Sequence, residues 1–250
     1  MRIIQLIMLG LILLGQAQPA RASAFSVSPT RLMLTPGVTS AVLTLTNAST
    51  NPVRFQLSAF TWDQSEDGRM RLVDTTDIVF YPPLLTIEAG QSRRVRVGAV
   101  VPIAALEKTY RLFVEELPDH RGGAGPEAGI HVRTKMGVPI FLGAPRPTTR
   151  TIVENLELAD GDMYFHVSNR GTAHVLLQKV QIRGLSASGE QVFARSVDGW
   201  YLLAGRHLRF RIPVPPAQCA QAATIAVVAE SDRGPANARL ALTRSNCGGQ

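Results

Sequence analysis

The sequence predicts an all-β protein built from two sandwich domains and exported from the cytoplasm. Turn signals recur about every 8–12 residues, and short runs of alternating apolar and polar residues lie between them. No segment shows a long apolar repeat of helical period bounded by caps, and the best candidate, Ile103–Lys108, is one turn at most. The first residues have the composition of a secretory signal peptide.

The signal peptide is assigned to residues 1–24. A positive start is followed by an apolar run from Ile3 to Leu14, and Ala22–Ala24 (Ala-Ser-Ala) fits the small-x-small pattern of a cleavage site. The apolar run is too short to span a bilayer comfortably, and no later stretch is long and apolar enough. We therefore expect cleavage after Ala24 and no stable membrane insertion.

The charge and aromatic content argue against a nucleic-acid partner. The chain has 26 Lys and Arg against 19 Asp and Glu, and two of the arginines lie in the first 24 residues, so the mature chain carries a net charge of +5. Exported proteins seldom meet nucleic acid, and an aromatic content of 6% provides few surfaces on which bases could stack. We expect a basic surface exposed to solvent.

The first domain is predicted at residues 25–143. In the run Val53–Trp62, alternate residues from Val53 onward are apolar, which is the pattern of a half-buried strand. Residues 121–129 are rich in glycine and are interpreted as a loop before the last strand of the domain. The other clear runs are Ser40–Asn47, Gln91–Val97 and Tyr110–Leu117.

The second domain is predicted at residues 151–250, after a hinge at residues 144–150. Prolines stiffen such a linker and remove backbone donors, so sheets tend to end there. The strand pattern then restarts, with runs at Tyr164–Ser168, Val175–Ile182, His207–Ile212, Ala223–Ala229 and Ala238–Leu242.

The two cysteines of the chain are predicted to form a disulfide. Cys219 and Cys247 are equidistant from residue 233, the middle of a hairpin expected around Asp232–Pro235. Such a hairpin places the two cysteines opposite one another, and an even count in an oxidising compartment favours a bridge.

The sequence contains no recognisable catalytic motif, and neither a cofactor nor a metal site is predicted. The glycine loop is not followed by a helical pattern, so it is weak evidence for phosphate binding. His166 and His174 could meet across two strands and bind a metal, but histidines with ordinary surface roles are much commoner.

The segment Ile130–Ile140 is the most informative part of the chain. One parity is apolar apart from Thr134, and the other carries polar or small residues and Pro139. Its position after a loop and its proline favour an edge strand, although periodicity alone fits an ordinary half-buried strand equally well. An open edge could add a strand to an incomplete partner, or it could promote self-association of the free protein.

The first domain contains a set of short motifs, at Phe25–Leu32, Leu34–Gly37, Leu43–Asn47, Pro82-Pro83, Ala89–Val97, Tyr110–Leu112, Glu116–Pro118 and Val138–Phe141. Together they resemble those of the periplasmic pilus-assembly chaperones of the PapD/FimC kind. The ending Val138–Phe141 and the long strand before it are most similar to the archaic branch, which serves spore-coat-U-like and Csu-type pili. Asn169–Val175 and Leu203–Gly205 of the second domain agree more loosely.

The resemblance implies two immunoglobulin-like domains in an L-shaped arrangement, a periplasmic location and no enzymatic activity. It further implies that the last strand of the first domain is lent to pilus subunits that lack a strand, which are then delivered to an outer-membrane usher. Carried onto this sequence, the donor side chains are Ile130, Val132, Thr134, Met136 and Val138.

Two basic residues of the family hold the carboxylate at the C-terminus of the subunit. Arg31 fits the first position, and an arginine fork suits a carboxylate geometrically. The family's lysine falls on Gly137 or Pro139, so Arg96 and Lys135 are the candidates for the second position. A solvated strand residue is the alternative interpretation for each of them.

Two other functions remain open. A two-domain adhesin or pilus structural subunit would lack a strand or carry an N-terminal extension, whereas the mature chain enters an expected strand at Phe25–Leu34 directly. An exported binding protein or hydrolase with immunoglobulin-like domains would need a convergent polar or metal cluster, which the sequence does not indicate.

Overall fold

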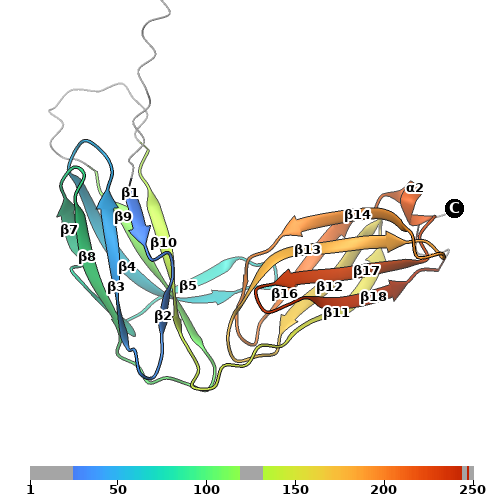
Figure 1. The fold of residues 1–250 in the computed structure, drawn as a ribbon, viewed down its shortest axis with the longest axis horizontal. Helices are drawn as coiled ribbons and strands as arrows, with labels where there is room; N and C mark the ends of the chain where they lie inside the picture. Colours follow the sequence, from blue (N-terminus) through green and yellow to red (C-terminus); the bar gives the residue numbers. More distant parts are fainter. Residues whose placement is uncertain (1–24, 119–131, 244–246, 248–250) are drawn as a thin grey trace, which may run out of the picture.

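The computed structural model describes residues 25–118, 132–243 and 247, which form two β-sandwiches set at an open angle to one another (Figure 1). Among these residues no helix is long and apolar enough to cross a membrane. The first sandwich contains β1 (Phe25–Ser28), β2 (Leu32–Leu34), β3 (Ser40–Asn47), β4 (Val53–Gln64), β5 (Met70–Asp74), β6 (Ile78–Tyr81), β7 (Leu84–Ile87), β8 (Ser92–Ala99), β9 (Lys108–Glu116) and β10 (Lys135–Leu142). The second contains β11 (Thr151–Ala159), β12 (Asp162–Asn169), β13 (Val175–Leu185), β14 (Gln191–Asp198), β15 (Tyr201–Leu202), β16 (His207–Pro213), the one-turn helix α2 (Pro216–Cys219), β17 (Thr224–Ser231) and β18 (Ala236–Ala241).

The first sandwich packs the sheet β1-β3-β8-β6 against the sheet β2-β10-β9-β4-β5, with β7 also paired to β4. Alternate residues of each strand point inward, as the period of two requires. Tyr110 is the largest side chain that is fully buried, and its hydroxyl donates a hydrogen bond to Asp77 over 2.8 Å. Burial and this carboxylate raise the pKa of the phenol well above its ordinary value.

The segment expected as one strand at Phe25–Leu34 forms two strands in different sheets. β1 pairs antiparallel with β3, whereas β2 pairs parallel with β10 in the opposite sheet. Pro29 follows β1 directly, and because it has no backbone N–H it cannot continue the ladder. The chain therefore crosses from one layer to the other and covers part of β10.

The second sandwich packs the sheet β11-β12-β16 against the sheet β14-β13-β17-β18, and β15 pairs with β13. The expected hairpin is confirmed, because β17 and β18 pair antiparallel around the turn near Asp232–Pro235. The disulfide is also confirmed: Cys219 at the end of α2 and Cys247 beyond β18 are bonded, with their Cα atoms 5.5 Å apart. The bridge fastens the end of the chain to the second sandwich.

Candidate functional site

Half of strand β10 has an open edge. β10 pairs with β9 along its whole length, but β2 covers its other side only at Ile140–Leu142. Within the described parts of the chain, no strand pairs with the outer edge of residues 135–139. The expected edge strand thus exists, although it begins at Lys135 rather than at Ile130, which lies outside the described residues.

Burial along the apolar parity of this segment decreases toward its N-terminal end. Val138 is 1% exposed and belongs to the core of the first sandwich, and Met136 is partly buried against that core. Thr134 is half-buried, and its carbonyl still accepts a hydrogen bond from the N–H of Glu116. Val132 is 58% exposed. The side chains available to a partner are therefore Val132, Thr134 and Met136. Val138 is not available, because it is buried in the core of the first sandwich.

The structure separates the three basic residues predicted from the sequence. Arg31 is exposed and immediately precedes Leu32, which pairs with Ile140, so Arg31 lies level with Pro139 of β10. Lys135 is an ion-pair partner of Glu115, with 2.9 Å between Nζ and the carboxylate. About four residues of strand, or roughly 13 Å, separate it from the level of Arg31.

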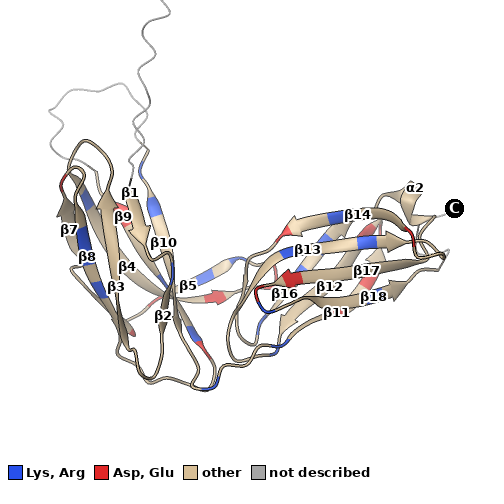
Figure 2. Ribbon diagram, viewed as in Figure 1, with Lys and Arg blue, Asp and Glu red and all other residues tan. Residues whose placement is uncertain are grey.

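Arg96 lies on the other sheet of the sandwich. It alternates on β8 with the buried Val95 and Val97, so its side chain is on the outer face of that sheet. Figure 2 shows basic positions in blue along β8. Its strand neighbours are Val42 and Tyr81, and β8 is not part of the sheet that contains β10. The structure therefore does not bring Arg96 together with Arg31 or Lys135.

A fourth basic residue, Arg111, was not predicted from the sequence. It lies on β9 opposite Pro139 and is 5% exposed. Its guanidinium carbon lies 4.0 Å from the ring centroid of Trp62 and 5.8 Å from that of Trp200, which belongs to the second domain. Burial lowers the pKa of the guanidinium, although arginine remains charged in proteins.

The buried donors around Arg111 lack acceptors. Nη1 donates a hydrogen bond to the carbonyl of Gly137 over 3.2 Å, but Nε and Nη2 have no partner among the described residues. The indole nitrogen of Trp62 is also buried and has no partner within the described part of the chain. A buried guanidinium whose own donors lack acceptors is energetically costly. An anion such as a carboxylate would accept hydrogen bonds from these donors.

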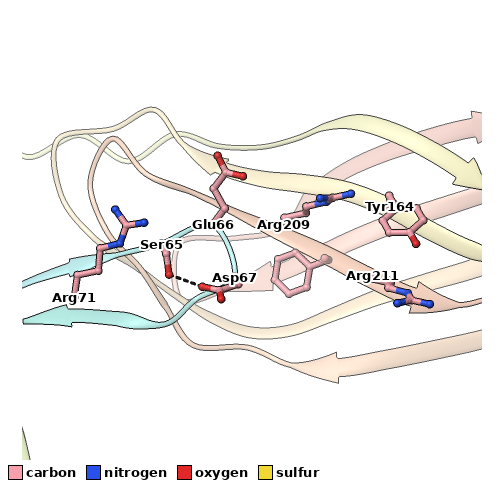
Figure 3. A pocket seen from close by; sticks show the side chains of 8 residues that line it. Ser65, Glu66, Asp67, Arg71, Tyr164, Arg209 and Arg211 are labelled. Carbon is pink, nitrogen blue, oxygen red and sulfur yellow. Dashed lines mark hydrogen bonds between the residues drawn. The ribbon is translucent and has the colours of Figure 1, made fainter.

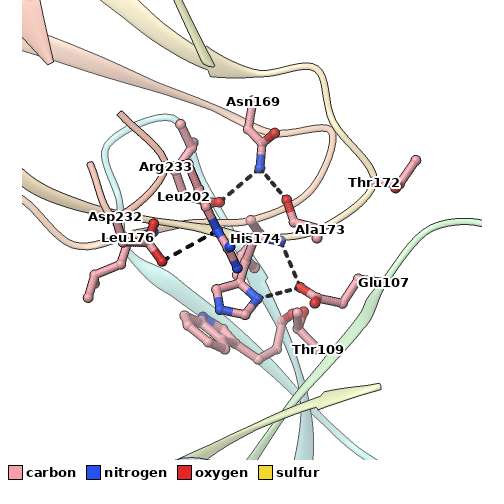
Figure 4. A network of polar contacts seen from close by, with 12 residues as sticks. Glu107, Thr109, Asn169, Thr172, Ala173, His174, Leu176, Leu202, Asp232 and Arg233 are labelled. Carbon is pink, nitrogen blue, oxygen red and sulfur yellow. Dashed lines mark hydrogen bonds and ion pairs between the residues drawn. The ribbon is translucent and has the colours of Figure 1, made fainter. Parts of the chain in front are cut away.

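The junction between the sandwiches is fixed by buried polar contacts beside this site (Figure 4). Glu107 of the first domain accepts hydrogen bonds from the N–H and Nδ1 of His174 in the second, over 2.9 Å and 2.8 Å. The His174 ring also stacks on Phe141 at 3.6 Å between centroids. Both Glu107 and His174 are buried. The considered pairing of His166 with His174 as metal ligands is therefore wrong, because His174 serves the domain junction.

A second contact at the junction involves Gln64, which is 5% exposed. Its side-chain amide donates to the carbonyl of Tyr201 over 2.6 Å and accepts from the N–H of Leu203 over 3.0 Å. Asp63 pairs with both Nε and Nη2 of Arg206, over 2.7 Å and 2.9 Å. Asp63 and Gln64 of β4 thus bind the second domain at residues other than the His174 that Glu107 holds. Together these contacts stabilise the angle between the sandwiches seen in Figure 1.

Residues 24–151 match the family profile described as pili and flagellar-assembly chaperone, PapD N-terminal domain. This match covers half of the chain. The chain belongs to this chaperone family. Comparison with curated protein sequences gives no match.

Solved structures show the same fold for both domains of this chaperone. One match is the CsuC–CsuE chaperone–tip adhesion subunit pre-assembly complex from archaic Csu pili of Acinetobacter baumannii, with 17% identity, a TM-score of 0.61, and coverage of 87% of this chain and 98% of the other. A second is the Salmonella enterica SafA pilin–SafB chaperone complex, with 15% identity, a TM-score of 0.57, and coverage of 88% and 98%. A third is the E. coli chaperone DraB, with 16% identity, a TM-score of 0.54, and coverage of 90% and 98%. The predicted PapD-like fold, with two immunoglobulin-like domains, is confirmed.

Gly137, one of the two positions at which the sequence predicts the family's lysine to fall, has no room for a side chain. A Cβ atom at Gly137 would lie 2.9 Å from Cε1 of Phe113, so the aromatic ring occupies the space that a side chain would need. Lys135 instead lies over the same ring, 4.9 Å from its centroid. The sequence does indicate on which face of β9 Arg111 lies. Tyr110 and Leu112 are apolar and face inward, so the residue between them faces the other side of the sheet.

Proposed function

We propose that this protein is a periplasmic chaperone that captures pilus subunits by donor-strand complementation and delivers them to an outer-membrane usher. The open edge of β10 carries this proposal. A strand of an incomplete subunit pairs with residues 135–139, and the apolar side chains that precede and begin β10 enter its groove. The family assignment favours this function over an adhesin or a hydrolase. No covalent chemistry is needed.

The donor side chains in this proposal are Val132, Thr134 and Met136, with Ile130 continuing the same parity outside the described residues. Val138 supports the strand from within the core. Val132 is 58% exposed in the free protein, so its complete burial by a subunit contributes about 1–2 kcal/mol to the complex.

The subunit's C-terminal carboxylate is proposed to bind Arg31 and Arg111. Both lie level with Pro139, on the two sides of β10, and Arg111 offers donors that have no acceptor within the described chain. Lys135, which is paired with Glu115, lies nearer the donor side chains. The two arginines would set the register in which the subunit enters the edge, because a carboxylate accepts from fixed guanidinium donors.

Co-expression with a pilus subunit encoded beside this protein, followed by native mass spectrometry of the periplasmic extract, tests the proposal. We expect a 1:1 complex that is lost with Val132→Asp and with Arg31→Ala. Val79→Asp is the matched control, because Val79 is 49% exposed on β6, an edge strand of the other sheet. Recovery of a stable subunit without bound partner, or an unchanged complex with Val132→Asp, would refute the donor-strand assignment.

A further inference from the structure

Two histidines and a glutamate meet where the β4–β5 turn of the first domain touches the second domain. The possible ligand atoms of Glu66, His166 and His207 all lie within 4.8 Å of one another. Oε1 of Glu66 lies 3.0 Å from Nε2 of His207, and the two imidazole centroids are 5.3 Å apart. These residues belong neither to the open edge of β10 nor to the surroundings of Arg111.

The sheet register places the two histidines on one face. His166 of β12 lies opposite Arg209 of β16, and His207 lies opposite Ser168. The histidines are therefore diagonal neighbours across the strand pair, a separation that imidazole side chains can bridge. His207 is exposed and His166 is half-buried, so a metal ion could reach both from solvent.

A β-bulge in β11 holds the ring of His166. The register of β11 against β12 shifts between Glu154 and Glu157, and Asn155 takes a positive φ of 56°. Its side-chain nitrogen lies 3.4 Å from Nδ1 of His166. The amide nitrogen donates in this contact, which places the proton of a neutral His166 ring on Nε2. A metal bound at Nε2 requires the Asn155 amide to turn over, so that its oxygen accepts from Nδ1–H and orients the ring.

Glu66 is supplied by the first domain and held by its backbone. The N–H of Arg209 donates to the carbonyl of Glu66 over 2.7 Å, which fastens the turn to β16. Figure 3 shows Glu66 beside Arg209. Both residues line a hollow of about 700 Å³ that is open to solvent and is also lined by Tyr164. The hollow provides access for an ion and for water.

The ligand set suits zinc. Zinc bonds of about 2.0–2.2 Å place the ligand atoms of a tetrahedral site roughly 3.3 Å apart, so the pair Glu66–His207 is close to this spacing at 3.0 Å. A ligand atom of His166 lies within 4.8 Å of the other two and would move toward the ion by rotation of its side chain. Two imidazoles and one carboxylate leave a fourth position for water. The guanidinium of Arg209 stays over the ring of Tyr164, 5.2 Å from its centroid, and adds positive charge that moderates the affinity.

We propose that Glu66, His166 and His207 bind one Zn²⁺ ion and thereby tie the two domains of the chaperone together. The ion would link the β4–β5 turn to β12 and β16 and stabilise the angle between the two sandwiches. The proposal is independent of the identity of the subunit.

Isothermal titration of the mature, metal-free chain with Zn²⁺ tests this site, using a protein without a histidine tag. We expect one ion per chain, with affinity reduced at least tenfold by His207→Gln and by Glu66→Ala. The matched control is His120→Gln combined with His131→Gln, which replaces two other histidines and should keep full affinity. At a free Zn²⁺ concentration about 100 times Kd, Tm should rise by about 5 °C.

Circular dichroism of each metal-free variant checks that it folds, and Glu66→Ala remains informative if a histidine variant does not. Loss of affinity with Glu66→Ala establishes that the first domain contributes a ligand. The proposal is overturned if Zn²⁺ does not bind, if His207→Gln and Glu66→Ala both keep wild-type affinity, or if only the His120 and His131 control loses binding.

Discussion

Replacement of Arg111 by methionine distinguishes a binding role for the buried guanidinium from a purely structural one. The substitution removes two donors without partners, each of which costs about 1–3 kcal/mol when buried. It also removes the hydrogen bond to Gly137, worth about 1.5–3 kcal/mol, and the contact with the ring of Trp62, worth about 0.5–2 kcal/mol. These contributions nearly offset one another, and the methionine side chain keeps the packing of the aliphatic stem.

The free energy of unfolding should therefore change by no more than about 1 kcal/mol with Arg111→Met, as measured by urea denaturation. The free energy of subunit binding should become less favourable by about 2–5 kcal/mol, because the subunit's carboxylate would lose a buried, charge-assisted partner. Native mass spectrometry and competition titration with the wild-type chaperone measure this loss. Arg96→Met is the control, since Arg96 lies on the outer face of the other sheet and should affect neither quantity.

The result that would refute this reasoning is a stability loss of several kcal/mol with unchanged subunit affinity. That outcome would make Arg111 a structural cation whose main role is to pack between Trp62 and Trp200. Arg111→Lys sharpens the comparison, because lysine keeps the charge but cannot reproduce the planar fork. We expect an intermediate affinity for that variant.

Three further predictions concern the domain junction and the two cores. Glu107→Ala should destabilise the chaperone by about 3–5 kcal/mol, because it leaves two buried donors of His174 unpaired. Calorimetry should then show two separate melting transitions, one for each domain, and a loss of stability below about 1 kcal/mol would contradict this. The raised pKa of Tyr110 means that the folded state holds this proton more tightly than the unfolded state, so the contribution of Tyr110 to stability is constant below about pH 10 and is lost as the pH rises above it. Tyr110→Phe should reduce the loss of stability above about pH 10 in denaturation curves, and an equal loss in both proteins would contradict this. Replacement of Cys219 and Cys247 by serine opens a bridge that spans a separation of 28 residues and should lower the free energy of unfolding by roughly 3–4 kcal/mol in urea denaturation, and an unchanged value would contradict this.

Strand positions could be predicted from the sequence where one face of a strand is buried. The alternation of apolar and polar residues located β3 at its observed bounds and β4 within two residues of its end. In strands with one buried face, this alternation fixes which residues point into the core. The crossing from β1 to β2 could not be predicted, since the apolar residues on both sides of Pro29 enter the same core from opposite sheets. Periodicity records that a residue is buried, but not which layer supplies it.

The candidate site was predicted in part. The position of β10 after a glycine-rich loop and its proline indicated the edge, but the sequence did not reveal that Val138 is buried in the chaperone's own core. Arg96 and Arg111 show the limit more clearly: both lie between apolar strand residues, so the sequence presents them alike. Only the tertiary arrangement places Arg111 under Trp200 at the domain junction and Arg96 on an outer face.

The open edge of β10 is too short to hold a partner by its main chain alone. Only alternate residues of 135–139 direct their N–H and C=O groups to the open side, and Pro139 has no N–H. At about 1 kcal/mol for each net hydrogen bond, these groups contribute a few kcal/mol, whereas association costs an estimated 4–15 kcal/mol. Capture therefore requires burial of the side chains from Val132 to Met136 in an apolar groove, which an incomplete sandwich offers. Because the hydrogen bonds of the edge contribute less than association costs, two copies of the chaperone should not pair strongly through the backbone alone. Self-association of the free chaperone, which stays a prediction, would require burial of the same side chains.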